Sequence, residues 1–132
     1  MENKIVVHMK DGVVHKGVTH DFRPDAEAFH LLPAEGGGVP IRVTVDAMKA
    51  LFYVKDYLGN RDFKARRQFE HARRDGRRAV VKFADGEEVW GFLGEGYDDE
   101  GTGFFFFPVD TEDNNLRIFV IRSAMKELQV VA

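Results

Sequence analysis

The residues of this sequence that are best suited to chemistry are arginines gathered in one short stretch. Residues 60–78 carry a net charge of +5. Arginine presents a planar fork of N–H donors that binds phosphate oxygens in pairs, so a band of arginines is typical of a site for phosphate or nucleic acid. The candidates for such binding are Arg66, Arg67, Arg73, Arg74, Arg77 and Arg78.

The charge of this arginine band has a second explanation in the rest of the chain. Residues 1–59 carry a net charge of −1 and residues 79–132 carry −7, within a formal net charge of −3 for the whole chain at pH 7. The basic segment can therefore dock on the acidic segment that follows it, in the same chain or in a neighbouring subunit. We favour docking over phosphate binding, and both interpretations stay open.

The residue types that commonly carry out catalysis form no recognisable active site. The chain has no cysteine, and its one serine, Ser123, does not lie in a Gly-x-Ser-x-Gly turn. A nucleophile also needs a neighbouring base and an orienting group, and no pattern in the sequence supplies them. The acidic residues fall in short clusters that are typical of solvated hairpin loops. We therefore expect a protein that is not an enzyme, with no metal site and no cofactor.

Two histidines could form a metal or proton pair, depending on the length of one hairpin loop. An Asp-Gly step follows the first apolar stretch and predicts a hairpin, because glycine adopts positive φ at little cost. A two-residue loop would place His8 opposite His15, whereas a three-residue loop would pair Val7 with His15. We favour the three-residue loop, because Val89 takes the position of His15 in a matching later hairpin and suits an apolar face.

The chain contains an approximate internal repeat. IVVHMKDGVVHKGV, which starts at Ile5, matches AVVKFADGEEVWGF, which starts at Ala79, with Asp-Gly and a later glycine aligned. FHLLP then matches FFFFP, and VTVDAMKAL matches VIRSAMKEL, at offsets that grow from 74 to 77. The repeat predicts two small domains, or two halves of one pseudo-symmetric unit.

Each repeat has the pattern of five short strands with a single helical turn before the fifth, which is the layout of an SH3-like small barrel. Between the repeats, Asn60 suits a helix N-cap, Gly76 suits a C-terminal stop, and apolar residues recur at helical spacing. The expected fold class is therefore mainly β, with two tandem five-stranded barrels joined by an α-helix. The expected domains are a first barrel at 1–57, a helical basic linker at 58–76 and a second barrel at 77–132.

Four consecutive phenylalanines, residues 104–107, predict an interface. Side chains alternate between the two faces of a strand, so two rings fill the core and two point outward. The outer rings need cover, since burying each one contributes about 1.5–3 kcal/mol. The expected interface residues are Phe63, Phe69, Trp90, Phe105 and Phe107.

Three features of the second repeat resemble the Sm-like family. They are GRRAVVKFADGEEVWGF with its Asp-Gly step and later glycine, the aromatic-aspartate step at Tyr97-Asp98, and IRSAMKEL at 121–128. The resemblance implies a helix followed by a strongly bent five-stranded barrel. Sm-like proteins hold uracil-rich RNA with an asparagine in the loop before the third strand, where this sequence has DAEAF and EGTGF. The resemblance therefore supports the fold rather than RNA binding.

The arginine band is also similar to part of the PilZ pattern for cyclic di-GMP. Arg73 and Arg77, or Arg74 and Arg78, have the R-x-x-x-R spacing ahead of the strand that begins at Ala79. The second PilZ motif needs a serine, and the DDEGTG segment has none. A cyclic dinucleotide is thus an alternative ligand for the arginines.

Length and composition limit the remaining choices. A chain of 132 residues with 44% hydrophobic and 31% charged residues is typical of a globular protein of one ordinary or two very small domains. The apolar runs are too short to cross a membrane, and the absence of cysteine suits the cytoplasm, so we expect a cytoplasmic protein. We expect a recognition or scaffold protein with a protein partner or a homo-oligomer, and nucleic-acid binding as the alternative.

Overall fold

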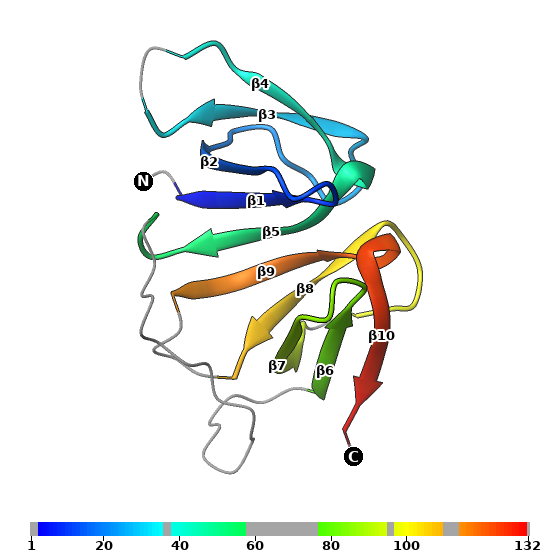
Figure 1. The fold of residues 1–132 in the computed structure, drawn as a ribbon. Helices are drawn as coiled ribbons and strands as arrows, with labels where there is room; N and C mark the ends of the chain where they lie inside the picture. The colour runs from blue at the N-terminus through cyan, green and yellow to red at the C-terminus, as the bar shows by residue number, and fades with distance from the viewer. Residues whose placement is uncertain (1–2, 36–37, 58–76, 95–96, 110–113, 132) are drawn as a thin grey trace.

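The computed structural model describes residues 3–35, 38–57, 77–94, 97–109 and 114–131. Ten strands form one antiparallel sheet in the order β10-β6-β7-β8-β9-β5-β1-β2-β3-β4 (Figure 1). The strands are β1 (Ile5–Met9), β2 (Val14–Val18), β3 (Ala28–Pro33), β4 (Ile41–Thr44), β5 (Met48–Val54), β6 (Arg78–Phe83), β7 (Glu88–Leu93), β8 (Gly103–Pro108), β9 (Asn115–Ile121) and β10 (Met125–Val130). A 3₁₀ turn precedes β5 (η1, Val45–Ala47) and another precedes β10 (η2, Arg122–Ala124).

The prediction of two closed barrels joined by an α-helix is wrong, because a single open sheet runs through the molecule. A closed barrel pairs all its strands among themselves, whereas β5 pairs here with β9. That pairing merges the strands before and after residues 58–76 into one sheet. The described part of the chain contains no α-helix, and the expected linker helix at 58–76 lies outside the described residues.

The sheet consists of two halves with the same strand order. The N-terminal half (β1–β5) runs β5-β1-β2-β3-β4, and the C-terminal half (β6–β10) runs β10-β6-β7-β8-β9. Each half contains a 3₁₀ turn between its fourth and fifth strands, as the sequence pattern predicts. Fifth strand β5 of one half and fourth strand β9 of the other lie side by side in the middle of the molecule (Figure 1).

The Asp-Gly hairpins have the expected three-residue loops. Val7 pairs with His15, and Val81 pairs with Val89. Gly12 and Gly86 adopt φ angles of 94° and 96°, which explains why glycine occupies both positions. His8 and His15 therefore point to opposite faces of the hairpin and do not form a pair.

Glycines also allow neighbouring strands to approach closely. A Cβ atom on Gly17 would lie 2.0 Å from the carbonyl oxygen of Leu32, and one on Gly91 would lie 2.1 Å from that of Phe107. Real Cβ atoms do not come so near, so any side chain at these two positions would push the strands apart. The glycines thus allow β2 to lie close to β3, and β7 to lie close to β8.

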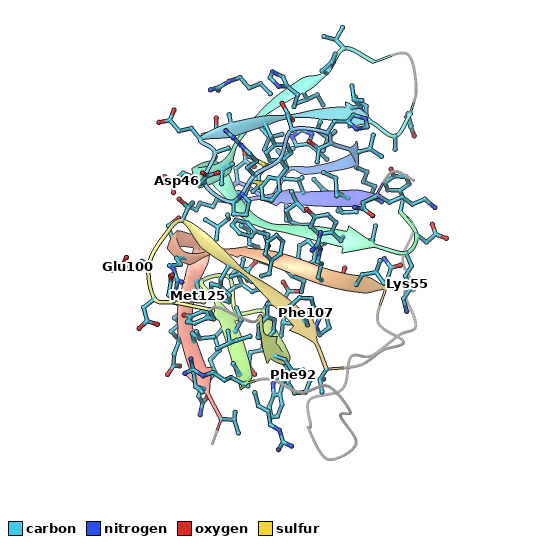
Figure 2. The ribbon with its side chains drawn as sticks, turned by 180° about the vertical axis from the view of Figure 1, so that it is seen from behind. Asp46, Lys55, Phe92, Glu100, Phe107 and Met125 are labelled. Atoms are coloured by element: carbon cyan, nitrogen blue, oxygen red, sulfur yellow. The ribbon has the colours of Figure 1, made fainter. Side chains whose placement is uncertain are left out.

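The core lies around the two central strands, where side chains from both halves meet (Figure 2). All residues of β5 are buried except the half-buried Lys49. Phe104 and Phe106 of β8 are buried, whereas Phe105 and Phe107 are half-buried, as the alternation of strand side chains predicts. The second pair therefore remains partly open to solvent.

Side-chain contacts reinforce the β5–β9 junction. Phe119 of β9 meets the ring of Phe22 edge-on at 5.2 Å, and Phe22 meets Phe29 in the same way at 5.1 Å. Lys49 of β5 reaches across to the β6–β7 loop, with its Nζ atom 2.7 Å from Asp85 and 2.6 Å from Glu87. Aromatic packing and ion pairs therefore hold the two halves together in addition to the strand pairing.

Candidate functional site: a cleft between the two halves

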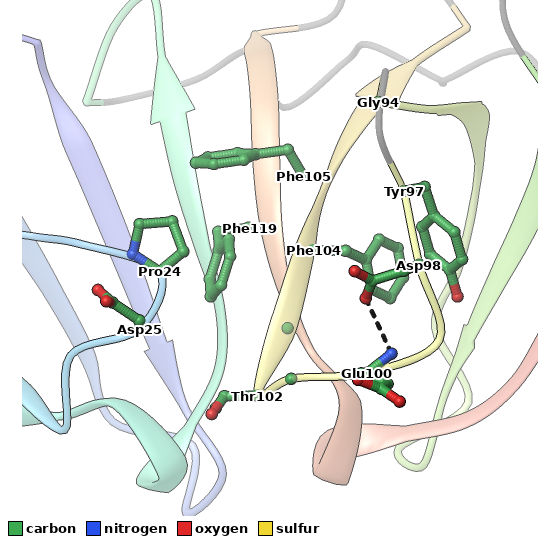
Figure 3. Close-up of a pocket in the computed structure, with 12 residues that line it drawn as sticks. Pro24, Asp25, Gly94, Tyr97, Asp98, Glu100, Thr102, Phe104, Phe105 and Phe119 are labelled. Carbon is green, nitrogen blue, oxygen red and sulfur yellow. Dashed lines mark hydrogen bonds between the residues drawn. The ribbon is translucent and has the colours of Figure 1, made fainter.

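A cleft of about 480 Å³ opens where a loop of the N-terminal half meets β8 of the C-terminal half (Figure 3). Pro24 and Asp25 from the segment between β2 and β3 form one side. The rest of the lining comes from the C-terminal half, and its members are Gly94, Tyr97, Asp98, Glu100, Gly101, Thr102, Gly103, Phe104, Phe105 and Phe119. The site exists only because the β5–β9 pairing brings the two halves together.

Aromatic rings form the apolar part of this cleft. Phe105 of β8 meets Phe119 of β9 edge-on, with ring centroids 5.1 Å apart. The guanidinium of Arg117 lies 4.9 Å from the centre of the Phe105 ring and 4.2 Å from that of Tyr53. Phe119 is almost fully buried and supports Phe105, which is half-buried and accessible to a ligand.

The acidic rim is held in place by an arginine that binds backbone rather than carboxylate. Arg122 donates hydrogen bonds to the Oη atom of Tyr97 at 3.1 Å and to the carbonyl oxygens of Asp98 and Glu100. The Oδ1 atom of Asp98 accepts a hydrogen bond from the Glu100 amide at 2.9 Å, and Gly101 completes the turn with a φ of 91°. These contacts order the loop, and they use the carboxylate of Asp98 but not those of Asp99 and Glu100.

These carboxylates have few charged partners. Among the residues that the structure describes, no ion pair joins Asp98, Asp99 or Glu100 to a basic side chain. Within the described ranges, the ion pair of Asp25 on the opposite side is a long, exposed contact with Arg23, 3.9 Å between Nε and Oδ1. The cleft therefore combines an aromatic wall with negative charge that its own side chains do not neutralise.

This combination suits a group that is apolar along its length and positive at its end. Lysine and arginine bury their methylene stems on apolar surface while their charged heads stay near water or carboxylates. An aromatic face also attracts a cation directly. A phosphate would meet repulsion here, because the rim carries the same sign of charge.

A second polar cluster lies around Lys49. Burial alone would lower the pKa of Lys49, but hydrogen bonds to Asp85 and Glu87 outweigh it and raise the pKa. The same contact with Lys49, together with the Glu87 amide, lowers the pKa of Asp85. Burial and the neighbouring Lys49 charge lower the pKa of His8. Lys49, Asp85 and Glu87 are occupied in joining the halves. No set of three His, Asp or Glu side chains in the described ranges gathers to hold a metal.

The predicted interface residues are only partly brought together. Phe105 lines the cleft, whereas Phe107 and Trp90 are half-buried residues of β8 and β7 outside its lining. Phe63 and Phe69 lie outside the described residues.

The predicted arginine site is described at its last two residues. The guanidinium of Arg77 lies 5.9 Å from the centre of the Tyr97 ring, and Arg78 is the exposed first residue of β6. The other four candidates, Arg66, Arg67, Arg73 and Arg74, lie outside the described residues.

Sequence reasoning missed most of the cleft. Pro24 and Asp25 carry no motif, and the acidic residues 98–100 have the pattern of an ordinary solvated loop. The one usable signal was the outward-pointing pair of phenylalanines in β8, which predicts a surface that needs a partner. Nothing local indicates that the partner loop is Pro24-Asp25.

The comparisons with known proteins leave the function to be argued from the site. No curated protein matches the chain, and no solved structure matches it. In the described part of the chain, no helix has both the length and the apolar character needed to cross a membrane. The match to a family description extends over residues 1–132, and the chain therefore belongs to the family of unknown function DUF6982.

Proposed function

We propose that this chain is a non-catalytic recognition protein that binds a polypeptide segment of a partner in the cleft between its halves. The segment has a lysine or arginine next to a large apolar side chain. The observation that carries the proposal is a cleft whose lining combines the half-buried Phe105 with the acidic residues Asp25, Asp98 and Glu100.

The dimensions and chemistry of the cleft support a side-chain ligand. A volume of about 480 Å³ lies within the range of small-ligand and side-chain pockets. Binding energy at protein interfaces concentrates on a few buried aromatic or arginine anchors, and Phe105, packed edge-on against Phe119, supplies such an anchor. The carboxylates would select for positive charge and speed association at low salt.

The proposal is tested with three synthetic peptides of equal length. One contains Leu-Lys-Phe flanked by neutral residues, one has Glu in place of Lys, and one has acetyl-lysine. Binding is followed by chemical-shift changes of backbone amides in the ¹⁵N-labelled protein. We expect the lysine peptide alone to shift residues around Phe105 and Asp25, with an affinity that falls as salt is added.

Two variants test whether peptide binding depends on the cleft itself or only on the general acidity of the surface. Asp25→Asn and Phe105→Leu should each weaken the lysine peptide by about five- to tenfold, the change that about 1–1.4 kcal/mol produces. Asp99→Asn is the control for lost negative charge, because Asp99 belongs to the acidic loop of Asp98 and Glu100 but does not line the cleft. Equal loss in all three variants, or equal binding of the glutamate peptide, contradicts the proposal.

A parallel titration with single-stranded RNA tests the alternative function, which is nucleic-acid binding by the arginine band. Salt-sensitive RNA binding that is lost on substitution of Arg73, Arg74, Arg77 and Arg78 by alanine, without peptide binding, would assign the function to the arginine band instead.

A further inference from the structure

The β5–β9 pairing leaves two strands at the ends of the sheet, β4 and β10. β4 is the fourth strand of the N-terminal half, and β9 is the fourth strand of the C-terminal half. β10 and β5 are likewise the fifth strands of their halves. Among the described strands, the two edge strands are therefore the counterparts of the two strands that already pair inside the molecule.

The internal junction defines a register that the free edges can repeat. Inside the molecule Ile118 pairs with Phe52, and Phe119 pairs with Leu51. A spacing of 77 residues relates VTVDAMKAL to VIRSAMKEL and carries these pairs over to the edges. The corresponding edge pairs are Ile41 with Gln129 and Arg42 with Leu128.

We propose that the edge strand β4 of one copy of this chain pairs antiparallel with β10 of a second copy, in the register Ile41–Gln129 and Arg42–Leu128. The partner is thus a second copy of the same protein, and the two copies associate head to tail. The inference rests on continuity with the junction inside the chain, although the second copy would use the same acidic loop that lines the cleft of the peptide-binding proposal.

Charge complementarity across the new contact supports this partner. Within the molecule, Phe119 reaches the segment before β3 and packs on Phe22. Its edge counterpart, Arg42, is exposed and forms no ion pair with another described residue. In the proposed contact, Arg42 of one copy would reach the segment before β8 of the second copy, which carries Asp98, Asp99 and Glu100. An exposed cation therefore meets an acidic loop.

The two edge strands carry more polar residues than the internal β5–β9 junction, so the contact between copies is weaker than that junction. Gln129 stands where β5 has Phe52, and Arg42 stands where β9 has Phe119. A contact of this composition is reversible and weakens with salt, unlike the apolar junction inside the chain. A head-to-tail contact between unlike surfaces also forms a ring or an open chain of copies rather than a two-fold dimer.

The register is tested by disulfide capture, which the absence of native cysteine makes clean. The variant Ile41→Cys/Gln129→Cys places both thiols on the paired edges, and opposite residues of an antiparallel pair lie within disulfide range. Mild oxidation should give a ladder of covalent oligomers on a non-reducing gel. The control Ile41→Cys/Leu128→Cys is one residue out of register and faces the wrong side of the sheet, so it should give at least fivefold less product.

The charge contact is tested by exchange of signs. Arg42→Glu and Asp98→Lys/Glu100→Lys should each reduce self-association in sedimentation velocity, and their mixture should form hetero-oligomers because each variant then supplies the opposite charge. Unchanged association of the Arg42→Glu variant overturns the proposal. It is also overturned if the wild-type chain stays monomeric up to millimolar concentration, if both cysteine pairs react equally, or if the disulfide forms within one chain.

Discussion

A single methyl group added at Gly91 should destabilise the protein, and the size of the effect follows from the strand geometry. The Cβ atom of Gly91→Ala would lie 2.1 Å from the carbonyl oxygen of Phe107 and 2.8 Å from the Phe106 ring. The nearer atom belongs to the backbone, so relief requires β7 and β8 to separate at the Gly91–Pro108 pair. Overpacking of this kind costs about 1–3 kcal/mol, and we expect a value at the upper end.

The expected change in melting temperature takes one opposing effect into account. Replacing glycine by alanine restricts the unfolded chain and returns about 0.4–1 kcal/mol, which leaves a net loss of about 2 kcal/mol. With an unfolding entropy of about 2.1 cal/mol/K per residue over 132 residues, this loss lowers the melting temperature by about 7 °C. Thermal and urea denaturation followed by circular dichroism measure both quantities.

Gly94→Ala is the matched control, because it adds the same methyl group three residues further along. Its Cβ atom would lie 3.4 Å from the ring of Phe107, an ordinary van der Waals distance. We expect its stability to equal that of the wild type or to exceed it by up to about 1 kcal/mol, since the same restriction of the unfolded chain applies without a clash. The reasoning is refuted if Gly91→Ala is as stable as the wild type, or if Gly94→Ala loses as much.

Three further predictions concern the charged groups. Lys49→Met should lower stability by about 1 kcal/mol at neutral pH, because it removes the ion pair with Asp85. It should also flatten the loss of stability as pH falls below the ordinary aspartate pKa of about 3.8, where the unfolded chain takes up a proton that folded Asp85, with its lowered pKa, resists; an unchanged acid profile would contradict this. The lowered pKa of His8 means that the folded state resists its protonation, so stability should fall as pH drops below about 6.5. Urea titrations of His8→Gln should lack that slope, and an identical slope would exclude His8 as its source. The His30 side chain and amide lower the pKa of Asp21, so carboxyl ¹³C titration should show this pKa rising in His30→Ala, and no rise would show that the side-chain contact is absent in solution.

Local features of the fold were predictable because they depend on a few neighbouring residues. The positive φ of Gly12 sets the hairpin loop, and the loop sets the pairing of Val7 with His15. Alternation along β8 likewise assigns Phe106 to the core and Phe105 to the outer face. In each case the decisive interaction lies within a strand or a hairpin.

The arrangement of the strands was not predictable in the same way, because β5 can pair with more than one strand edge. The choice of β9 depends on residues far away in the sequence. One signal does bear on it: MKALFYV is apolar almost throughout, which indicates a strand covered on both faces rather than one wall of a small barrel. The cleft could not be predicted from the sequence for the same reason, since Asp25 and Phe105 come together only after the halves have joined.

The pairing of β5 with β9 also affects how the protein is made. On the ribosome β5 (Met48–Val54) emerges roughly 60 residues before β9 (Asn115–Ile121), a delay of about 3–12 s at ordinary elongation rates. During that interval the nascent chain exposes an apolar strand with one open edge, which is the kind of segment that aggregates. Translation that stops after the N-terminal half should therefore yield an insoluble fragment that depends on chaperones, while completion of β9 within the same polypeptide removes the hazard.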